Sequence, residues 1–508
     1  MLYKPLDKNP SIMLRPQTMV EHLIHIGVVF HIISMAGLIV FGSHRLWLAF
    51  CWRRSMADSP VRTAVPGVPA RVTIQIPLYN EKPVAGRIID AVAGISWPSD
   101  RLDIQVLDDS TDETKQIVDE RAVYWSKRDR PIRVIRRRSR AGFKAGALAN
   151  GLRHAKGEFI AIFDADFVPP TDFLEKTMPY FARPETGMVQ TRWGFSNAGY
   201  SWLTRIQAML LTPHFGMEHQ VRWSRSLFFN FNGTAGIWRK AAIEEAGGWQ
   251  ADTVTEDLDI SYRAQLAGWR FVYVNDVVVP SELPVFLSDF RSQQQRWSKG
   301  SIQTARKILP LICKSRVPFA VKLEAFAHLL ANLCWLFGFF AMLTLFPLIL
   351  CRTGIGPYQI IRIDIPVFFF SGGAFLIYYL VYILSSGQNG ALRYLPLLPA
   401  LSIGLAPSLS LAVVSGLFSN GGYFNRTPKL GIREKSHHLK IAFTGKRTGA
   451  AVSLMNLVLL LYTFAPIGLA VHRETWLAIP FLFLFPSGFL LIIGSSLRES
   501  LFSRFRID

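Results

Sequence analysis

Residues 55–322 alternate short apolar runs with helical patterns. Four runs have the length and apolar content of buried strands: Arg71–Pro77, Leu102–Leu107, Ile132–Arg136 and Phe159–Phe163. Helical patterns lie between them, as at Glu113–Ser126 and Lys144–His154. Alternation of strands and helices predicts a mainly parallel sheet with helices on both faces.

Longer apolar runs flank this stretch on both sides. They are Leu23–Phe50, Phe326–Leu350, Ile365–Leu384, Leu395–Phe418, Ala450–Val471 and Trp476–Leu497. Each has the ~20 residues that a helix needs to cross the hydrocarbon core of a bilayer. The run Leu395–Phe418 carries Pro396, Pro399 and Pro407, so we expect it to lie at the membrane interface. The first run is long for a signal peptide, and we expect a retained anchor.

Basic residues lie beside three of these runs. They are Arg53 and Arg54, then Arg306, Lys307, Lys314, Arg316 and Lys322, then Arg426, Lys429, Arg433, Lys435, Lys440, Lys446 and Arg447. The positive-inside rule places all three groups in the cytoplasm. That placement requires two spans between residues 322 and 426. The sequence therefore predicts five spans, with the N-terminus outside and the C-terminus inside.

The composition fits a chain that is part soluble and part membrane-bound. Of the 508 residues, 50% are hydrophobic, and the mean hydropathy is +0.24. The net charge of +20 is dispersed beside apolar segments, which the positive-inside rule explains without nucleic acid. The cysteines, at positions 51, 313, 334 and 351, lie far apart and imply neither a disulfide framework nor a metal site.

Polar residues follow three of the predicted strands. Glu81 comes shortly after the first, Asp108 and Asp109 follow the second, and Asp164 and Asp166 follow the fourth. Ligands bind beyond the carboxyl ends of the strands in such sheets, so we expect these side chains to converge. No G-x-G-x-x-G or G-x-x-x-x-G-K-[ST] loop is present, which argues against a dinucleotide site and a P-loop.

The acidic pairs each have two interpretations. Asp164 and Asp166 suit a divalent cation that also holds a diphosphate, because Mg²⁺ takes one or two protein carboxylates and completes its shell with water and phosphate oxygens. A D-x-D pair also occurs in solvated turns. Asp108 and Asp109 either cap a turn or helix start or accept a hydrogen bond from a nucleobase.

Two further motifs also have both a structural and a functional interpretation. In Ala141–Leu148 (AGFKAGAL), Lys144 starts a helix where phosphates can approach, although the small residues also suit close packing. Thr255-Glu256-Asp257 is either a capping box or presents Asp257 as a general base. Phe231–Gly236 (FNGTAG) is a small polar loop.

Taken in order, the motifs resemble those of the processive family 2 glycosyltransferases. The series is IQVLDDSTDET, AGFKAGAL, IFDADF, FNGTAGIW, TEDLDISYR and QQQRW, across about residues 71–305. The resemblance is strongest to plant cellulose synthase-like A proteins, the mannan and glucomannan synthases, and extends to bacterial cellulose synthase. It implies an α/β GT-A domain, which is a Rossmann-like nucleotide-sugar fold, inserted between transmembrane helices. It also implies an inverting transfer that makes β-linkages.

The resemblance assigns roles to single residues. Asp108 or Asp109 would hold the nucleobase end, Asp164 and Asp166 would bind Mg²⁺ or Mn²⁺ against the diphosphate, and Asp257 would be the catalytic base. The other residues expected to contact substrate are Lys144, Asn232, Gly233, Thr234, Glu256, Gln293, Gln294, Arg296, Trp297, Thr427 and Lys429.

The QQQRW segment precedes an apolar run. Arg296 can stabilise the charge that grows on a leaving diphosphate, and Trp297 offers a face to a sugar ring. The alternative is an amphipathic interface helix with a snorkelling arginine. Phe424–Lys429 (FNRTPK) resembles the FxVTxK gating loop of cellulose synthase, with Arg426 at the valine position.

The sequence predicts a membrane polysaccharide synthase that uses UDP-glucose or GDP-mannose. The alternative is a non-processive glucosyltransferase that makes a glycolipid on diacylglycerol or ceramide. A transporter is disfavoured because the spans carry almost no charged residues. The expected partners are the donor, a glycan or lipid acceptor and membrane lipids, but not nucleic acid. The sugar, the linkage, the oligomeric state and any periplasmic partner stay open.

Three domains are expected. Residues 1–54 form a tail and the first transmembrane helix, and residues 55–322 form a cytoplasmic GT-A domain with interface helices. Residues 323–508 form a transmembrane region with an interface helix and a gating-like loop at 420–449, without a PilZ-like domain. Together they predict a multi-pass protein of the inner or plasma membrane.

Overall fold

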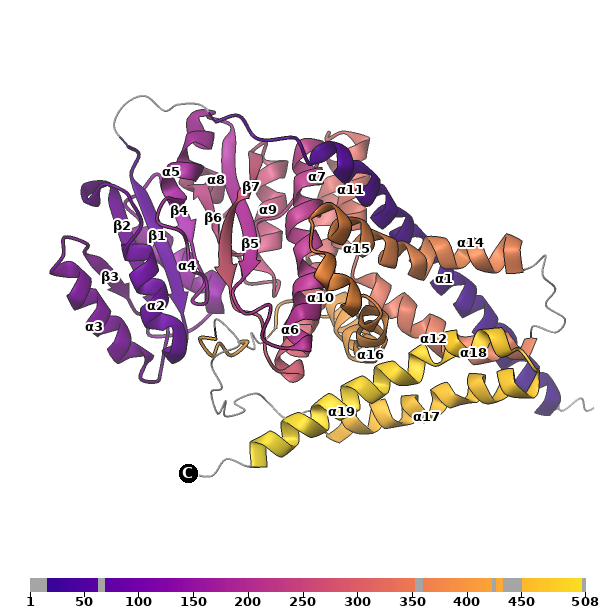
Figure 1. The fold of residues 1–508 in the computed structure, drawn as a ribbon. Helices are drawn as coiled ribbons and strands as arrows, with labels where there is room; N and C mark the ends of the chain where they lie inside the picture. Colours follow the sequence, from indigo (N-terminus) through magenta and orange to yellow (C-terminus); the bar gives the residue numbers. More distant parts are fainter. Residues whose placement is uncertain (1–15, 63–68, 352–359, 423–425, 433–449, 505–508) are drawn as a thin grey trace, which may run out of the picture.

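The computed structural model describes residues 16–62, 69–351, 360–422, 426–432 and 450–504. Figure 1 shows two parts, a sheet with helices around it and a bundle of long helices to its right. Some predicted features lie outside the described residues. These are Phe424 and Asn425 of the gating-like motif and the basic stretch 433–449.

A seven-stranded sheet forms the centre of the first part, in the order β3-β2-β1-β4-β6-β5-β7. Its strands are β1 (Val72–Leu78), β2 (Leu102–Asp108), β3 (Ile132–Ile135), β4 (Phe159–Ile162), β5 (Thr186–Phe195), β6 (Gly236–Arg239) and β7 (Arg270–Ser281). Strand β1 pairs in parallel with β2 and β4, and β2 with β3. Strand β6 runs antiparallel to β4 and β5, whereas β5 and β7 are parallel. The four predicted strands are present, and three unpredicted strands make the sheet mixed.

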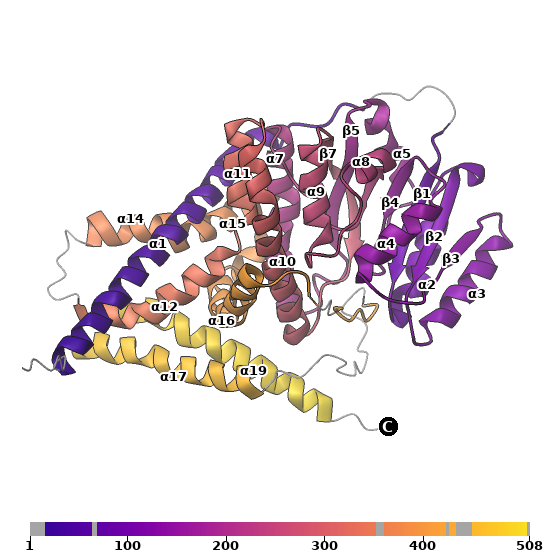
Figure 2. The ribbon, with the colours of Figure 1, turned by 180° about the vertical axis from the view of Figure 1, so that it is seen from behind.

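Helices cover both faces of the sheet. They are α2 (Lys82–Ala93), α3 (Thr114–Ser126), α4 (Phe143–His154), α5 (Phe173–Thr177), α6 (Trp202–Pro213), α7 (His219–Ser224), α8 (Lys240–Glu245) and α9 (Glu256–Leu266). Figure 1 shows α2 and α3 before one face, and Figure 2 shows α4, α8 and α9 before the other.

Two apolar cores result from this arrangement. Successive side chains of a strand point to opposite faces, and β4 follows that rule. Its Phe159 and Ala161 pack in the core with α2 and α3, whereas Ile160 and Ile162 pack with α4, α8 and α9. Both faces of β4 are therefore buried, which explains why this strand reads as a continuous apolar run.

The bundle comprises one N-terminal helix and the helices after β7. They are α1 (Pro16–Ser55), α10 (Leu287–Lys314), α11 (Phe319–Leu329), α12 (Leu333–Cys351), α14 (Ile365–Phe368), α15 (Ala374–Ser385), α16 (Leu397–Phe418), α17 (Ala450–His472), α18 (Ile479–Leu482) and α19 (Leu484–Arg504). Short 3₁₀ or π turns occur at Ser99–Arg101, Met178–Ala182, His214–Glu218, Ile360–Asp364, Phe369–Gly373, Asn389–Tyr394 and Trp476–Ala478.

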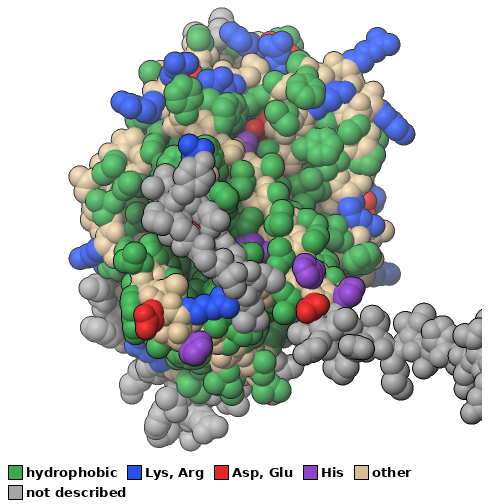
Figure 3. Space-filling view, turned by 90° about the vertical axis from the view of Figure 1, so that its right-hand side faces the viewer, with side chains coloured by type: hydrophobic (Ala, Val, Ile, Leu, Met, Phe, Trp, Pro, Cys, Tyr) green, Lys and Arg blue, Asp and Glu red, His purple; other side chains and the backbone are tan. Residues whose placement is uncertain are grey.

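Several described helices are long and apolar enough to cross a membrane. Five qualify alone: Glu21–Ser55, Arg362–Ser385, Leu397–Phe418, Val452–His472 and Trp476–Glu499. A bent pair, Phe319–Leu329 and Leu333–Ile349, qualifies together, with 56° between its helices. Figure 3 shows hydrophobic side chains over much of the end of the molecule away from the sheet. An apolar surface of that extent suits a membrane.

Helix α16 lies crosswise to the other long helices. It is seen nearly end-on in Figures 1 and 2, where α12, α17 and α19 run across the view. It packs against α10, α12 and α19. Of the 18 residues in its apolar stretch, 61% are buried inside the structure. By length and composition α16 is a candidate span, and the interface position that its prolines suggest stays a prediction.

Candidate active site

A pocket of about 180 Å³ lies at the carboxyl ends of the parallel strands. The residues of its wall come from the ends of β1, β4 and β7, the start of α9, α10 and the segment 426–432. Most predicted site residues line it: Asp109, Lys144, Asp164, Asp166, Asn232, Gly233, Glu256, Asp257, Gln293, Arg296, Trp297, Thr427 and Lys429. Three do not, namely Asp108, Thr234 and Gln294.

Asp108 and Asp109 are consecutive in the sequence, but only Asp109 lines the pocket. Asp108 ends β2 and is only 1% exposed. Its carboxylate accepts hydrogen bonds from the backbone N–H of Ser110 at 3.0 Å and from Nε of Arg136 at 2.8 Å. It therefore has the turn-capping role that the sequence left open. Asp109 lines the pocket instead, and its carboxylate is paired with the guanidinium of Arg137, whose Nε lies 3.0 Å from Oδ1.

The Asp164–Asp166 pair lies just beyond β4, and each carboxylate meets an ammonium group. Nζ of Lys144 lies 2.5 Å from Oδ1 of Asp164, and Nζ of Lys429 lies 2.7 Å from Oδ2 of Asp166. The described residues contain no group of three or more His, Cys, Asp or Glu side chains placed for a metal. Two carboxylates nevertheless fit Mg²⁺ or Mn²⁺, since such a cation takes its remaining ligands from water and phosphate.

Lys144 lies in the first turn of α4, and glycines allow it to approach the pocket. Gly142 precedes the helix with φ of +69°, a backbone conformation that glycine adopts at little cost. Nζ of Lys144 also donates to the carbonyl of Gly233 at 2.9 Å. The neighbouring charge of Asp164 raises the pKa of Lys144 although its burial opposes this, so the amine is protonated.

Asp257 lies in the first turn of α9. Thr255 is the N-cap but makes no capping hydrogen bond with its side chain, so the capping-box interpretation does not hold. Burial and the adjacent Glu256 raise the pKa of Asp257 to about 7. A Cβ atom added to Gly233, which has φ of +79°, would lie 2.8 Å from Oδ2 of Asp257. The glycine therefore leaves space beside this carboxylate.

Helix α10 brings the QQQRW segment to the same pocket. Gln293, Arg296 and Trp297 line it. Burial lowers the pKa of Arg296, while the charges of Glu256, Asp164 and Asp257 oppose the shift. Gly300 lets α10 lie against α9, because an added Cβ would be 2.5 Å from Oγ1 of Thr255. The helix that follows the motif is thus fixed against the start of the helix that carries Asp257.

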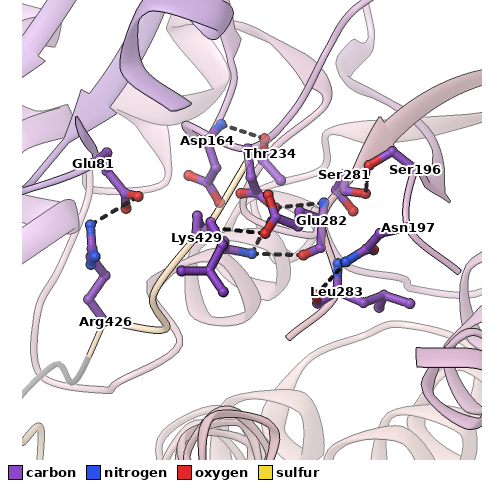
Figure 4. Close-up of polar contacts among 12 residues, drawn as sticks. Glu81, Asp164, Ser196, Asn197, Thr234, Ser281, Glu282, Leu283, Arg426 and Lys429 are labelled. Carbon is purple, nitrogen blue, oxygen red and sulfur yellow. Dashed lines mark hydrogen bonds and ion pairs between the residues drawn. The ribbon is translucent and has the colours of Figure 1, made fainter. Parts of the chain in front are cut away.

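The segment 426–432 closes one side of the pocket, as Figure 4 shows. Nη1 of Arg426 lies 3.0 Å from Oε2 of Glu81. Nζ of Lys429 donates to the carbonyl of Glu282 at 3.0 Å. The backbone N–H groups of Leu430 and Gly431 each donate to the Glu282 carboxylate at 2.9 Å. Glu282 therefore attaches this segment to the end of the sheet.

Some pocket residues have no counterpart in the sequence prediction. Glu282 lies between Pro280 and Pro284 without a recognisable spacing. The guanidinium of Arg140 lies 3.3 Å from the ring centre of Tyr79, and both residues line the pocket. Trp193, near the end of β5, also lines it. An acidic residue directly after an apolar strand is the signal that could have identified Glu282.

Comparison with known sequences identifies the domain that carries these residues. Residues 69–300 match the family model "Glycosyltransferase like family 2". Glucomannan 4-beta-mannosyltransferase 7 of Arabidopsis thaliana is 48% identical over 249 residues, which are 48% of this chain and 45% of that protein. Glucomannan 4-beta-mannosyltransferase 1 of Cyamopsis tetragonoloba is 47% identical over 259 residues, 50% of this chain and 49% of that protein. The matched region spans about half the length of these relatives.

A solved structure supports the fold. A mannosyltransferase of Pyrobaculum calidifontis, in complex with GDP-Man and Mn2+, superposes with a TM-score of 0.53 at 21% sequence identity. The superposition covers 77% of this chain and 98% of that one. It confirms the predicted GT-A fold, and the family match confirms the resemblance drawn from the motifs.

Proposed function

We propose that this chain, whose residues 69–300 carry a glycosyltransferase family 2 domain, is an inverting membrane glycosyltransferase. It transfers a hexose from a nucleotide sugar to a growing β-linked polysaccharide. The observation that carries the proposal is the meeting of Asp109, Asp164, Asp257 and Arg296 in one pocket. These residues come from separate elements, and together they supply a group for each part of a nucleotide sugar.

The nucleobase end is assigned to the side of the pocket at β1 and β2. Asp109 accepts a hydrogen bond from a nucleobase N–H. The ring of Tyr79, with Arg140 held 3.3 Å from its centre, offers a surface on which a base can stack. The pairing of Asp109 with Arg137 fixes the orientation of the carboxylate.

The diphosphate is assigned to the end of β4. Asp164 and Asp166 would hold Mg²⁺ or Mn²⁺, which would supply positive charge to the two phosphates. Lys144, placed in the first turn of α4, donates to the same phosphates. Lys429 comes from the segment 426–432 and adds a further positive charge at this site.

Asp257 is assigned as the general base. It accepts the proton of an acceptor hydroxyl as that oxygen forms a bond to the anomeric carbon of the donor. The bond from that carbon to the diphosphate oxygen breaks on the opposite face, so an α-linked donor gives a β-linked product. A pKa of about 7 suits a base that must be ionised before transfer and hold a proton afterwards.

Arg296 and Trp297 are assigned to the leaving group and the acceptor. Negative charge grows on the diphosphate as it departs, and the half-buried guanidinium of Arg296 stabilises it. Trp297 presents an aromatic face to the acceptor sugar. Gln293 supplies an amide that can bond to sugar hydroxyls, and its Oε1 atom is buried without a hydrogen-bond partner among the described residues.

The donor that we favour is GDP-mannose, with UDP-glucose as the second donor. The relatives in the comparison are named glucomannan 4-beta-mannosyltransferases, and the superposed archaeal structure contains GDP-Man. The sequence motifs alone do not identify the nucleobase or the sugar of the donor. The names of the relatives therefore support mannose.

The chain is proposed to be a multi-pass membrane protein with the domain 55–322 in the cytoplasm. The candidate spans and the basic residues beside them support this placement. Helix α16 is assigned to the interface and precedes the segment 426–432 in the chain. Under this arrangement the pocket lies at the cytoplasmic surface of the membrane, where a growing glycan can enter the bundle.

Product analysis tests the proposal. Purified chain in lipid nanodiscs is incubated with labelled GDP-mannose or UDP-glucose and with Mg²⁺ or Mn²⁺. We expect label in a polymer that β-mannanase or a mixture of β-mannanase and β-glucanase degrades. Label that extracts into organic solvent would instead indicate a glycolipid, and the absence of transfer from both donors would contradict the proposal.

A further inference from the structure

Trp193 lines the pocket but has no part in the mechanism above. It belongs to β5, two strands away from β4 in the sheet order. Strand β2, which leads into Asp109, lies two strands from β4 on the other side. Neighbouring strands are about 4.8 Å apart. Trp193 and Asp109 therefore flank the Asp164–Asp166 pair from opposite sides.

This placement matches the layout of a nucleotide sugar. The proposed nucleobase contacts lie toward β2, and the diphosphate contacts lie at β4. The hexose and the acceptor must then lie on the β5 side, where Trp193 contributes an indole to the wall. In Figure 4, Glu81 lies on one side of Asp164 and Ser196 lies on the other. Ser196 is three residues after Trp193 in the sequence.

The ring of Trp193 is firmly held. It stacks on Phe215 with 4.4 Å between ring centres and 30° between planes. Phe167, which follows Asp166, meets it edge-on at 5.0 Å. A sugar platform must have a fixed orientation, because ordering a mobile ring would weaken binding.

An irregularity in the sheet sets the position of this side chain. The register of β5 against β7 shifts between Thr191, which pairs with Val274, and Arg192, which pairs with Val278. Such irregularities redirect side chains and are over-represented next to active sites. Trp193 is the second residue after the shift and pairs with Val279.

The indole N–H of Trp193 is a hydrogen-bond donor without a partner among the described residues. Its Nε1 atom is buried, and burying an unpaired donor costs about 1–3 kcal/mol. A phenylalanine could stack on Phe215 without that cost. The larger ring does, however, extend the aromatic surface that the pocket presents.

We infer that Trp193 is a second aromatic platform, which binds the terminal hexose of the acceptor together with Trp297. The inference rests on the proposed glycosyltransferase function. The indole face makes apolar contact with the C–H face of the sugar and sets the acceptor hydroxyl in reach of Asp257. The donor nucleotide, on the far side of Asp164, does not contact this ring.

The test compares three variants: Trp193→Ala, Trp193→Phe and Trp238→Phe. Trp238 is a matched control, because it is fully buried, does not line the pocket and also has an unpaired Nε1 atom among the described residues. The probe is β-1,4-linked mannohexaose or cellohexaose, with GDP-mannose or UDP-glucose as donor. KM is measured for the acceptor and the donor separately.

For Trp193→Ala we expect the acceptor KM to rise by about tenfold, as for loss of a central aromatic contact, with the donor KM unchanged. Trp193→Phe should have an acceptor KM close to that of the wild type. Trp238→Phe should have wild-type KM values for both the acceptor and the donor. Equal changes in both constants for Trp193→Ala would overturn the inference, because they would indicate packing alone. So would an unchanged acceptor KM.

Calorimetric titration of the hexaose into the chain with GDP or UDP present separates this inference from the proposed function. The wild type should bind the hexaose, and Trp193→Ala should lose that binding even if turnover is absent. If the wild type binds the hexaose but transfers nothing, and Trp193→Ala loses that binding, the proposed function fails and the inference holds; a Trp193→Ala variant that binds as the wild type does overturns the inference. A wild type that binds neither hexaose overturns the inference.

Discussion

Nζ of Lys429 lies 2.7 Å from Oδ2 of Asp166. Lys429 belongs to the segment 426–432, whereas Asp166 follows β4 in the sheet, so this contact joins the two parts of the molecule. The amine is buried, and the neighbouring charge of Asp166 raises its pKa although desolvation opposes this. A protonated ammonium thus neutralises one of the two carboxylates proposed to bind the metal.

Removal of this ammonium should strengthen metal binding in the absence of nucleotide. For Lys429→Met we expect Mn²⁺ to bind about tenfold more tightly, which corresponds to ~1.4 kcal/mol, because Asp166 no longer has a competing cation. Titration of free Mn²⁺ by electron paramagnetic resonance measures this affinity. Lys307→Met is the control, since Lys307 pairs with Asp252 and Asp259 and does not line the pocket. Equal affinities in wild type and Lys429→Met would contradict the expectation.

Asp257→Asn should abolish transfer while nucleotide binding persists. An amide cannot accept the proton of the acceptor hydroxyl, so we expect the rate to fall by about 10²–10⁴-fold. Calorimetry with GDP or UDP and Mn²⁺ should give wild-type affinity, because Asp257 is not assigned to the nucleotide. Full activity of this variant would rule out its role as the base.

The pH dependence of transfer should follow the ionisation of Asp257. Burial and Glu256 raise its pKa to about 7, and only the ionised carboxylate can accept a proton. We therefore expect kcat/KM to rise with pH below about 7 and to level off above it. Initial rates from about pH 5.5 to 8.5 would report this limb. A profile that is flat below neutrality would show that another group is the base.

Asp108 and Asp109 should respond differently to the same substitution. Asp109→Asn is expected to raise the donor KM, because Asp109 lines the pocket. Asp108→Asn should lower the free energy of unfolding by about 1–3 kcal/mol, since it breaks the hydrogen bonds of a buried carboxylate. Donor kinetics and thermal unfolding of the two variants make the comparison. The reverse result would return the nucleobase role to Asp108.

Gly300→Ala should disturb the pocket without changing any residue in its wall. The added Cβ would lie 2.5 Å from Oγ1 of Thr255, so α10 must move away from the start of α9. Overpacking of this kind costs about 1–3 kcal/mol. Transfer should fall along with thermal stability. Gly338→Ala on α12 is the control, because an added Cβ there meets nothing within 4 Å. Wild-type behaviour of Gly300→Ala would show that the contact is not needed.

The parallel half of the sheet could be predicted because its strands are short apolar runs that end in acids. Strands β5 and β7 could not, since β5 contains Arg192 and β7 contains Asn275 and Asp276 within the apolar pattern. Strand β6 is only four residues long and overlaps the end of the FNGTAGIW motif. Its antiparallel course depends on tertiary pairing, which local pattern does not encode.

The candidate site could be predicted where residue type and strand position coincide, as for Asp164 and Asp166. The choice between Asp108 and Asp109 could not, because successive residues at a strand end point to opposite sides. Lys429 was assigned to substrate from its motif, but its contact with Asp166 depends on how the bundle sits against the sheet. Trp193 has no motif, and its place in the pocket follows from an irregular register.

The pairing of Lys429 with Asp166 spans 263 residues of chain, and Glu282 is attached to the same segment. A fragment cut at residue 322 would therefore keep two buried acids, Asp166 and Glu282, and lose the Lys429 ammonium and the two backbone N–H groups that pair with them. Its isolated sheet would carry more net negative charge at the mouth of the pocket. Fragments meant for binding studies should retain residues 426–432, by fusion or as an added peptide, if they are to reproduce the metal affinity of the whole chain.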